Sequence, residues 1–359
     1  MHDYLLSLVL GVVEGVTEFL PVSSTAHLRI SEALLGIHLG DGYWKMFTIV
    51  IQLGAICTLP IYFRARIAAF LRGFAEARRE GRSVVAQPLT LTVVAFVVTA
   101  VPSLLLSRVI GQHLESLVVM GTSLVVGGVV MWVVDWLFAR GALRTHTKQL
   151  EGMGLGQAVW IGFCQIASAV FPGTSRSMAT IAAGQVAGMT RAAALEFSFF
   201  LSMPTMVAAT GYDLYKTLRE GQASVLGGAV LTAHGWVVLG IGFLVSFVVA
   251  YGVVAWFVSW VRRRGFVPFA VWRILAGAAV LLWMVRPTPS NTAARFMDRR
   301  ARECGTPSSC SDARSIWFTA AGTYTPLVSE GQPAVVGWHR LRHLRAHEFI
   351  PVKGMARVP

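Results

Sequence analysis

Apolar residues occur in long runs through residue 286 of this chain, and polar residues gather in the short segments between the runs. A helix needs about 20 consecutive apolar residues to cross the hydrocarbon core of a bilayer. Six runs approach or exceed that length: about 43–63, 84–108, 116–138, 192–211, 236–261 and 267–286. The pattern therefore predicts an all-α polytopic membrane protein with about six transmembrane helices.

Basic residues concentrate in three segments between the runs, at 64–82, 140–148 and 262–264. Short basic loops of membrane proteins stay in the cytoplasm, and the six crossings alternate without conflict when all three loops lie there. The chain is 14% charged, whereas soluble domains are typically about 25% charged. We therefore interpret the net charge of +13 as a signal for orientation in a membrane, and we expect no nucleic-acid partner.

Two stretches, 11–28 and 162–181, place prolines, glycines and hydroxyl side chains within apolar surroundings. The second stretch repeats the first at an offset of 151 residues. The aligned pairs include Gly11 and Gly162, Pro21 and Pro172, Ser24 and Ser175, and Ile30 and Ile181. The same offset aligns apolar runs of the two halves, so we infer two repeats, about 1–138 and 152–287, within one membrane domain at 1–287.

The basic loops also set the orientation of the two repeats. With those loops in the cytoplasm, the first motif enters the membrane from outside and the second enters from the cytoplasm. The repeats are therefore inverted, and each motif has to return to the face from which it came. We predict that each motif is a re-entrant hairpin of two half-helices, and that the two breaks meet near the membrane midplane.

The C-terminal residues 288–359 are polar and basic, are rich in Arg, Pro and Ser, and lack sustained apolar periodicity. We predict that they form a separate extension that is largely disordered. Two of the four cysteines, Cys57 and Cys164, fall in apolar runs, and the other two fall in this extension. The spacing of the cysteines predicts no metal site.

Glu14 and Glu18 lie four residues apart, so a helix places both carboxylates on one face, where like charges repel. The repulsion grows in a membrane interior. A carboxylate pair there indicates a shared cation, a shared proton, or one acid and one base. The alternative is that both carboxylates simply face water at the membrane surface.

Pro21 interrupts the helix that carries this pair, and the hydroxyl residues that follow can cap a new helix. These residues are Ser23, Ser24 and Thr25. Ser24 and His27 are three residues apart on one helix face, a spacing that suits a hydroxyl nucleophile and an imidazole base. The alternative is that the hydroxyls only cap the helix and that His27 only binds a carbonyl.

The second motif, "PGTSRS" at 172–177, predicts an anion site. Gly173 permits close approach of the backbone, and the planar fork of Arg176 suits phosphate better than a lysine does. The hydroxyls beside them belong to Thr174, Ser175 and Ser177. If both breaks meet, two helix N-termini and one guanidinium converge on a phosphate, with two carboxylates and room for a divalent ion beside it.

Three further polar residues are weaker candidates for the functional site. Gln165 occupies the position aligned with Glu14, so the acidic residues belong to the first repeat. The second repeat supplies the residues that would bind the anion, which we call the anion clamp: Arg176 and the hydroxyls beside it. Glu196 and Arg273 lie within apolar runs, where each could orient the site or form a structural pair. We attribute the glycines of "VVGGVV" at 125–130 to close helix packing.

Together, "EGVTEFLPVSSTAHL" at 14–28 and "PGTSRSMAT" at 172–180 resemble the two signature motifs of the undecaprenyl-diphosphate phosphatase family, the bacitracin-resistance type. The resemblance extends over roughly residues 1–287 and includes "EFSFFLSMP" and the segment around Arg273. It implies hydrolysis of the terminal phosphate of a long isoprenoid diphosphate at the periplasmic side of the bacterial inner membrane. The product would be the monophosphate lipid carrier for peptidoglycan synthesis.

The resemblance also implies roles for single residues. Glu14 and Glu18 match the family's acidic pair, which is linked to dependence on a divalent cation, Mg²⁺ or Ca²⁺. Ser24 matches the family's proposed nucleophile, His27 its proposed base and Arg176 its phosphate-binding arginine. Attack by Ser24 through a phosphoserine and direct attack by water both stay open.

A transporter or flippase of the lipid phosphate is the alternative function, because inverted repeats around a midplane site also serve alternating access. A transporter needs the anion clamp but neither a nucleophile nor a base, so Ser24 with His27 favours the enzyme. The partners we expect are a polyprenyl diphosphate lipid and the bilayer, and a homodimer is kept open. The sequence departs from the family pattern at Ala26, where glycine is usual, and at Trp272, where tyrosine is common.

Overall fold

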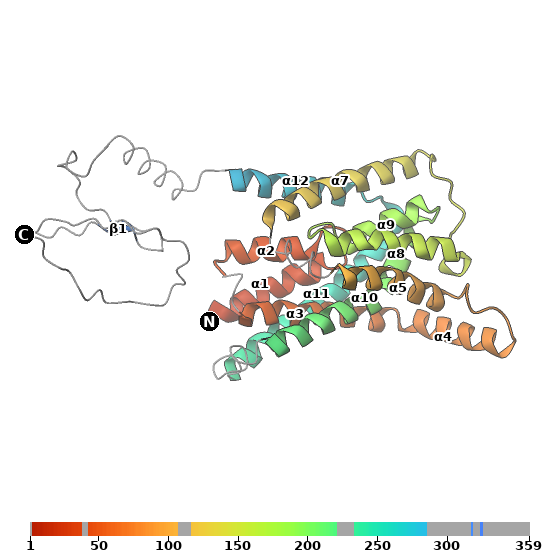
Figure 1. Cartoon of the computed structure of the whole chain (residues 1–359), viewed down its shortest axis with the longest axis horizontal. Helices are drawn as coiled ribbons and strands as arrows, with labels where there is room; N and C mark the ends of the chain where they lie inside the picture. Colours follow the sequence, from red (N-terminus) through yellow and green to blue (C-terminus); the bar gives the residue numbers. More distant parts are fainter. Residues whose placement is uncertain are drawn as a thin grey trace, which may run out of the picture. The chain divides into compact units, whose positions relative to one another are not determined.

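The chain forms two units, Met1–Arg286 and Pro287–Pro359, and the first unit is a bundle of helices (Figure 1). The computed structural model describes residues 2–37, 42–106, 116–220 and 233–285, together with two short strands, β1 (Trp317–Phe318) and β2 (Tyr324–Thr325).

Within the described residues, six helices of the first unit are long and apolar enough to cross a membrane, namely α3, α5, α7, α10, α11 and α12. They coincide with the six predicted runs, so the all-α polytopic fold is confirmed. The helical elements in chain order are α1 (His2–Thr17), α2 (Ser24–Leu34), α3 (Gly42–Tyr62), α4 (Arg64–Arg79), α5 (Pro88–Leu105), α7 (Leu117–Ala139), the 3-10 helix η1 (Leu150–Gly152), α8 (Leu155–Val170), α9 (Arg176–Val186), α10 (Arg191–Glu220), α11 (Ala233–Arg263) and α12 (Val267–Val285).

The basic segment after α3, expected to be a loop, is the helix α4. Arg78 and Arg79 lie in its last turn, where their charges offset the negative end of the helix dipole. Phe70 and Ala77, seven residues apart, are buried. The pattern of membrane-length runs does not predict α4, because it is a 16-residue helix that contains five arginines and one glutamate.

Each motif forms two helices separated by a break of a few residues. α1 ends at Thr17 and α2 begins at Ser24, with Pro21 between them, and α8 ends at Val170 and α9 begins at Arg176. Proline cannot donate the backbone hydrogen bond that would continue a helix. The paired half-helices agree with the prediction, whereas their re-entry into a bilayer stays a prediction.

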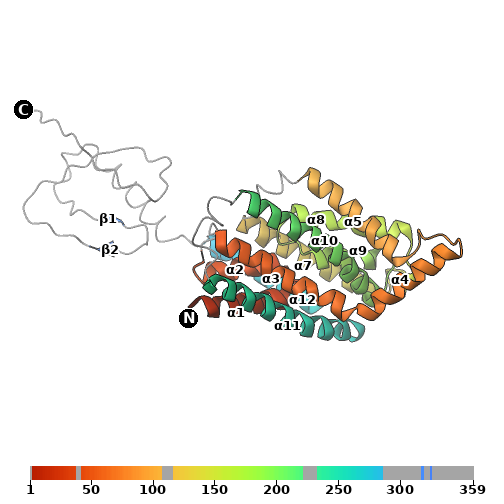
Figure 2. The ribbon, with the colours of Figure 1, turned by 90° about the horizontal axis from the view of Figure 1, so that it is seen from below.

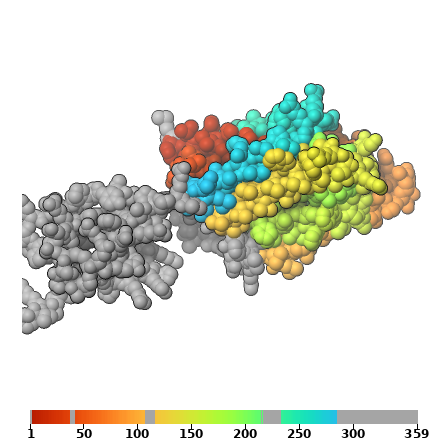
Figure 3. Space-filling model, turned by 90° about the horizontal axis from the view of Figure 1, so that it is seen from above, coloured from red at the N-terminus to blue at the C-terminus, as the bar shows by residue number. Residues whose placement is uncertain are grey.

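The packing of the helices follows the internal repeat. Under the offset of 151 residues, α1 corresponds to α8 and α5 corresponds to α11. In the structure α1 packs against α11 and α8 packs against α5, so the two contacts exchange when the repeats are exchanged. Corresponding helices also meet each other, α3 with α10 and α7 with α12. Figure 2 shows α3 lying along α11, and Figure 3 shows α7 in yellow beside α12 in blue.

The basic segments gather at one end of the bundle. α4 and the segment after α7 lie at the same end in Figure 1. There the buried Asp135 of α7 accepts hydrogen bonds from Arg191 Nε at 2.7 Å and from the backbone N–H of Phe266 at 2.9 Å. One carboxylate therefore ties α7 to the start of α10 and to the turn between α11 and α12.

Large apolar side chains cover the outside of the spanning helices. Val97 of α5, Val130 of α7 and Val248 of α11 are each about half exposed. Lipid chains cover such a surface in a membrane, whereas water would leave a large apolar patch exposed. The outer surface thus agrees with a multi-pass membrane protein.

In the second unit, β1 and β2 pair antiparallel, with Trp317 opposite Thr325. Apart from these strands, the residues predicted to be largely disordered, 288–359, lie outside the described residues. That prediction therefore stays a prediction.

Candidate active site

The two breaks meet through an ion pair. Arg176, the first residue of α9, donates a hydrogen bond from Nη2 to Oε1 of Glu18 at 3.0 Å. Both side chains are largely buried, with 12% of Arg176 and 4% of Glu18 exposed. The structure therefore brings together residues from two motifs that are separate in the sequence.

Glu18 also binds Ser24. Its second oxygen, Oε2, accepts a hydrogen bond from the Ser24 hydroxyl at 2.5 Å. A serine hydroxyl that donates to a carboxylate is arranged to lose its proton when the oxygen attacks an electrophile. One carboxylate thus contacts both the candidate nucleophile and the candidate phosphate ligand, Arg176.

Ser23 and Ser175 hold both helix starts in an unusual backbone conformation. Their φ angles are 76° and 68°, and no other non-glycine residue in the described part of the chain has a positive φ. Each immediately precedes the first residue of a half-helix, α2 or α9. Such conformations cost about 1–3 kcal/mol each and gather at functional sites. The same strain in both repeats therefore marks both breaks as parts of one site.

Glu14 is buried without a partner. Neither of its carboxylate oxygens has a hydrogen-bond partner among the described residues, and the side chain is fully buried. A buried, unpaired carboxylate is unfavourable unless a proton or a cation stabilises it. Because Mg²⁺ and Ca²⁺ bind carboxylate oxygens, Glu14 with Glu18 one helical turn later fits the predicted divalent ion.

The protein supplies few ligands for such an ion. Among the described residues there is no group of three or more His, Cys, Asp or Glu side chains that could hold a metal. An ion at Glu14 and Glu18 would therefore take its other ligands from phosphate oxygens and water, as Mg²⁺ often does.

Four further buried side-chain atoms lack hydrogen-bond partners in the described part of the chain, namely Nη1 of Arg176, Oε1 of Gln165, Oε1 of Gln185 and Nε of Arg273. Gln165, the residue aligned with Glu14, donates from Nε2 to Thr205 at 3.2 Å. Arg176 keeps an N–H group after it has bound Glu18, and a phosphate oxygen would satisfy that group.

His27 binds groups other than Ser24. Its Nδ1 donates to the Ser23 carbonyl at 2.8 Å, and its Nε2 accepts from the indole N–H of Trp272 at 2.8 Å. The planes of the two rings are 17° apart and their centroids are 6.0 Å apart, because the hydrogen bond joins the rings edge to edge. Both ring nitrogens are therefore engaged, and the acceptor beside the Ser24 hydroxyl is Glu18. Helical spacing suggested the pair of Ser24 and His27, but the Ser24 hydroxyl turns back toward the break.

Arg273, a lower-ranked candidate, holds the two breaks together from α12. Its side chain is fully buried. The guanidinium donates to carbonyl oxygens of both breaks and of α7, namely those of Pro21 at 3.1 Å, Gly173 at 3.0 Å, Thr174 at 2.9 Å and Ser123 at 3.2 Å. Of the two roles that the sequence left open, the geometry favours orientation of the site.

Two glycines make room for this arrangement. A Cβ atom on Gly127 would overlap the guanidinium of Arg273, and one on Gly173 would lie 2.6 Å from the carbonyl oxygen of Met120. Gly173 also has a φ of 93°, which glycine adopts without strain. Gly127 thus accommodates an arginine in addition to close helix packing, and Gly173 allows its break to approach α7.

The other predicted phosphate-binding hydroxyls lie in different settings around the breaks. Ser175 caps α9, because its hydroxyl accepts from the backbone N–H of Met178 at 3.4 Å. Ser177 is buried and Thr25 is exposed, and Thr174 borders an apolar groove. Their binding of phosphate stays a prediction.

Glu196, the other lower-ranked acid, pairs with a residue outside the two motifs. Its Oε1 accepts a hydrogen bond from Nε of Arg66 in α4 at 2.7 Å. For Glu196 the geometry therefore favours a structural pair over a role in orienting the site.

An apolar groove of about 750 Å³ extends from the second break along α7, α8 and α9. Phe171 and Thr174 line it at the break, and Val186 lines it at the far end of α9. The exposed Phe163 also borders the groove, so it opens on the lipid-facing surface. The groove therefore extends from the second break to the surface that faces lipid.

Residues 7–279 match the family described as bacitracin resistance protein BacA. The chain belongs to this family. A relative named undecaprenyl-diphosphatase, from Koribacter versatilis (strain Ellin345), is 62% identical over 289 residues, which cover 80% of this chain and 100% of the relative. Undecaprenyl-diphosphatase 2 of Paramagnetospirillum magneticum is 42% identical over 286 residues, which cover 77% and 98% of the two chains.

A third relative, the undecaprenyl-diphosphatase of Rhizobium etli (strain CIAT 652), is 39% identical over 280 residues, which cover 78% of this chain and 96% of the relative. The match to the BacA family spans both motifs and reaches into α12. This match confirms the resemblance to the family that the two motifs indicate.

Proposed function

We propose that this member of the BacA family hydrolyses undecaprenyl diphosphate to undecaprenyl phosphate and inorganic phosphate, which recycles the lipid carrier of peptidoglycan synthesis. The observation that carries the proposal is the Glu18 carboxylate, which binds Ser24 at 2.5 Å and Arg176 at 3.0 Å. The names of the relatives support the same reaction, since all three are undecaprenyl-diphosphatases.

In this mechanism the Ser24 hydroxyl attacks the terminal phosphorus and Glu18 accepts its proton. The bond from Oγ to phosphorus forms as the bond to the bridging oxygen breaks, and undecaprenyl phosphate leaves. Arg176 and the N-termini of α2 and α9 stabilise the charge on the transferring group. Water then hydrolyses the phosphoserine and releases inorganic phosphate. Direct attack by water, with Ser24 only binding phosphate, would use the same charged groups.

A divalent cation, Mg²⁺ or Ca²⁺, fits beside Glu14 and Glu18. The unpaired oxygens of Glu14 support this assignment. When bound, the ion would offset the repulsion between the two carboxylates and the diphosphate and stabilise charge on the transferring phosphoryl group. The protein's own part is to hold the two carboxylates on one face of a helix that ends at the break.

The groove along α7, α8 and α9 suits the polyprenyl chain of the substrate. It begins at Thr174, one residue before the cap of α9, and its lining is almost entirely apolar. A chain lying in the groove would bury apolar surface while its diphosphate reaches Arg176.

The gathering of basic segments at one end supports an orientation with that end in the cytoplasm and with a site that faces the periplasm of the inner membrane. A transporter or flippase is not favoured, because transport does not require a serine hydroxyl bound to a carboxylate. A homodimer stays a prediction, which the mass of the detergent-solubilised protein would test.

Phosphate release from a long-chain polyprenyl diphosphate by the purified full chain in detergent tests the proposal. We expect release with Mg²⁺ or Ca²⁺, loss of release with a chelator, and a loss of more than about 100-fold in Ser24→Ala. Ser31→Ala, on the same helix, is the matched control and should keep full activity. Well-folded wild-type protein that binds lipid phosphate without releasing phosphate would contradict the enzyme and favour the transporter.

A further inference from the structure

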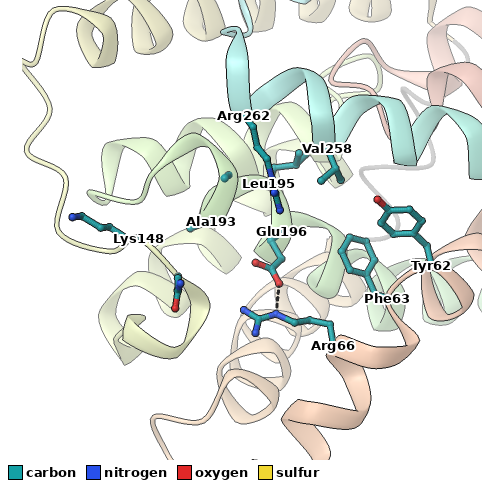
Figure 4. A pocket seen from close by; sticks show the side chains of 11 residues that line it. Tyr62, Phe63, Arg66, Lys148, Ala193, Leu195, Glu196, Val258 and Arg262 are labelled. Atoms are coloured by element: carbon teal, nitrogen blue, oxygen red, sulfur yellow. Dashed lines mark hydrogen bonds and ion pairs between the residues drawn. The ribbon is translucent and has the colours of Figure 1, made fainter.

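A second cavity, of about 500 Å³, is lined by Arg66, Lys148 and Arg262 of the three basic segments and so lies at their end of the bundle. Figure 4 shows the side chains that line it. Its walls come from the junction of α3 and α4, from the residues before η1, and from the first turns of α10 and the last turns of α11. None of the residues that line it, among those the structure describes, belongs to the two breaks. The cavity is therefore separate from the candidate active site.

One cation of this cavity is fully engaged. Arg66 donates from Nε to Glu196 at 2.7 Å and from Nη1 and Nη2 to the two oxygens of Glu151 at 2.7 and 3.1 Å. Burial disfavours its charge, yet these two carboxylates raise the pKa of Arg66 above its ordinary value. Arg66 thus stays charged and offsets the carboxylate of Glu196, which lines the cavity.

Two other cations of the lining are available to a ligand. Arg262 and Lys148 form no ion pair or hydrogen bond through their side chains with any residue that the structure describes. Figure 4 shows Arg262 extending from α11 toward Glu196. Together with Arg66, Glu196 and the Glu151 carboxylate that pairs with Arg66, the cavity has three cations and two carboxylates, a net charge of +1. An anion is therefore the ligand that its charge favours.

The walls give this anion site two further properties. Ala192 and Ala193 belong to the first turn of α10, a helix of 30 residues whose N-terminal end favours negative charge. Phe63 and Val258 supply apolar wall on the side of the spanning helices α3 and α11. A charged end next to an apolar wall at the end of a membrane bundle matches a lipid whose headgroup carries phosphate.

We propose that this cavity binds the phosphate headgroup of an anionic lipid at the membrane face that carries the basic loops, with Arg262 and Lys148 as the cations that hold it. The site is distinct from the one between the breaks, and its existence does not depend on the phosphatase reaction. Free phosphate shares the chemistry of the headgroup, so the test has to separate the two sources.

Native mass spectrometry of the full chain with phosphatidic acid tests the proposal, and Arg176→Ala disables the anion clamp between the breaks. We expect the Arg176→Ala protein to keep one phosphatidic acid adduct and to bind no phosphatidylcholine in its place. Adding Arg262→Gln should weaken that adduct about tenfold or more, because one charge-assisted hydrogen bond is lost. Lys148→Gln should weaken it in the same direction.

Arg263→Gln is the matched control, since Arg263 is exposed beside Arg262 and does not line the cavity. It should leave the adduct unchanged. In an otherwise wild-type chain, the Arg262→Gln protein should have the melting temperature and the rate of phosphate release of the wild type. That result would show that the variant is folded.

Loss of all adducts in Arg176→Ala, or equal weakening by Arg263→Gln, would overturn the second site. Displacement of phosphatidic acid by millimolar inorganic phosphate would assign the cavity to free phosphate and overturn the lipid assignment. A failed phosphatase assay would leave these binding results unaffected, so the two proposals fail separately.

Discussion

Glu18 is the residue through which the two repeats share one site. Its carboxylate accepts one hydrogen bond from Ser24 of its own repeat and one from Arg176 of the other. A proton acceptor has to lie within hydrogen-bond reach of the proton that it takes, and Glu18 meets that condition for Ser24. His27 does not meet it here, because Ser23 and Trp272 engage both of its nitrogens.

Replacing Glu18 with glutamine should lower kcat for phosphate release by about 100-fold or more, since general base catalysis contributes about 10²–10⁴-fold. Glutamine keeps the shape of the side chain but cannot accept the proton. Steady-state kinetics on the purified variant measure the change. His27→Gln serves as the comparison and should lose less activity. If His27→Gln abolishes release while Glu18→Gln retains it, the base is His27, as the helical spacing suggested.

Arg273 occupies a position where a lysine could not make the same hydrogen bonds. A single ammonium cannot reach the carbonyls of Pro21, Gly173 and Ser123 together, whereas the guanidinium fork does. Arg273→Lys should therefore destabilise the protein by about 1–3 kcal/mol, because buried carbonyls lose their partners. It should also reduce activity, because the two breaks separate.

Thermal unfolding and phosphate release, measured side by side, test the role of Arg273. The control is Arg263→Lys, an exposed arginine that should change neither quantity. An Arg273→Lys protein with unchanged melting temperature and activity would show that Arg273 does not hold the breaks together.

At the scale of elements, α7, α8 and α9 form a wall beside the second break that the corresponding helices α12, α1 and α2 do not reproduce beside the first. Beside the first break the indole of Trp272, from α12 of the second repeat, binds His27, whereas the position aligned with Trp272 in the first repeat is Gly121. The groove beside the second break offers about 750 Å³ of space to a long apolar chain.

Filling the far end of this groove should affect long substrates only. Val186→Trp places a large ring where α9 ends and should lower kcat/KM for a C55 diphosphate by about tenfold or more. A C10 diphosphate should be affected much less, because its shorter chain ends before Val186, which lies about 15 Å along α9 from Arg176. Val159→Trp is the control, since Val159 is exposed on α8 and does not line the groove. Equal losses for both chain lengths would place the polyprenyl chain elsewhere.

At the scale of the whole molecule, the two repeats pack as a pair related by a two-fold exchange of α1 and α11 with α8 and α5. This exchange places two breaks, two helix N-termini and two sets of side chains at one point. Each repeat alone lacks half of the site, because the acids come from the first and the arginine Arg176 comes from the second.

Accessibility of single cysteines tests the orientation of the molecule in a membrane. In a cysteine-free background, a cysteine at Glu80, after α4, should react only with reagents that enter the cytoplasm. A cysteine at Leu105, at the other end of α5, should react from outside. Labelling of position 80 from outside would contradict the inverted orientation of the repeats, and labelling of both from one side would contradict the assignment of α5 as a crossing helix.

The sequence by itself determined the features that depend on local order along the chain. Apolar runs of membrane length predict the six spanning helices, Pro21 and the hydroxyls after it predict a break, and the offset of 151 residues predicts that Pro172 marks a second one. The same local pattern also indicates the family, because each of the two signature motifs is a short, contiguous stretch of sequence.

Only the tertiary structure decided which residues meet. The partner of Ser24 is Glu18 rather than His27 because the break turns the chain back on itself, a change of direction that helical spacing cannot represent. The roles of Arg273 and of the cavity at Arg262 depend on contacts between helices that are far apart in sequence. Hydrogen bonds and cavities of this kind follow from how the helices pack, and packing is a property of the whole bundle.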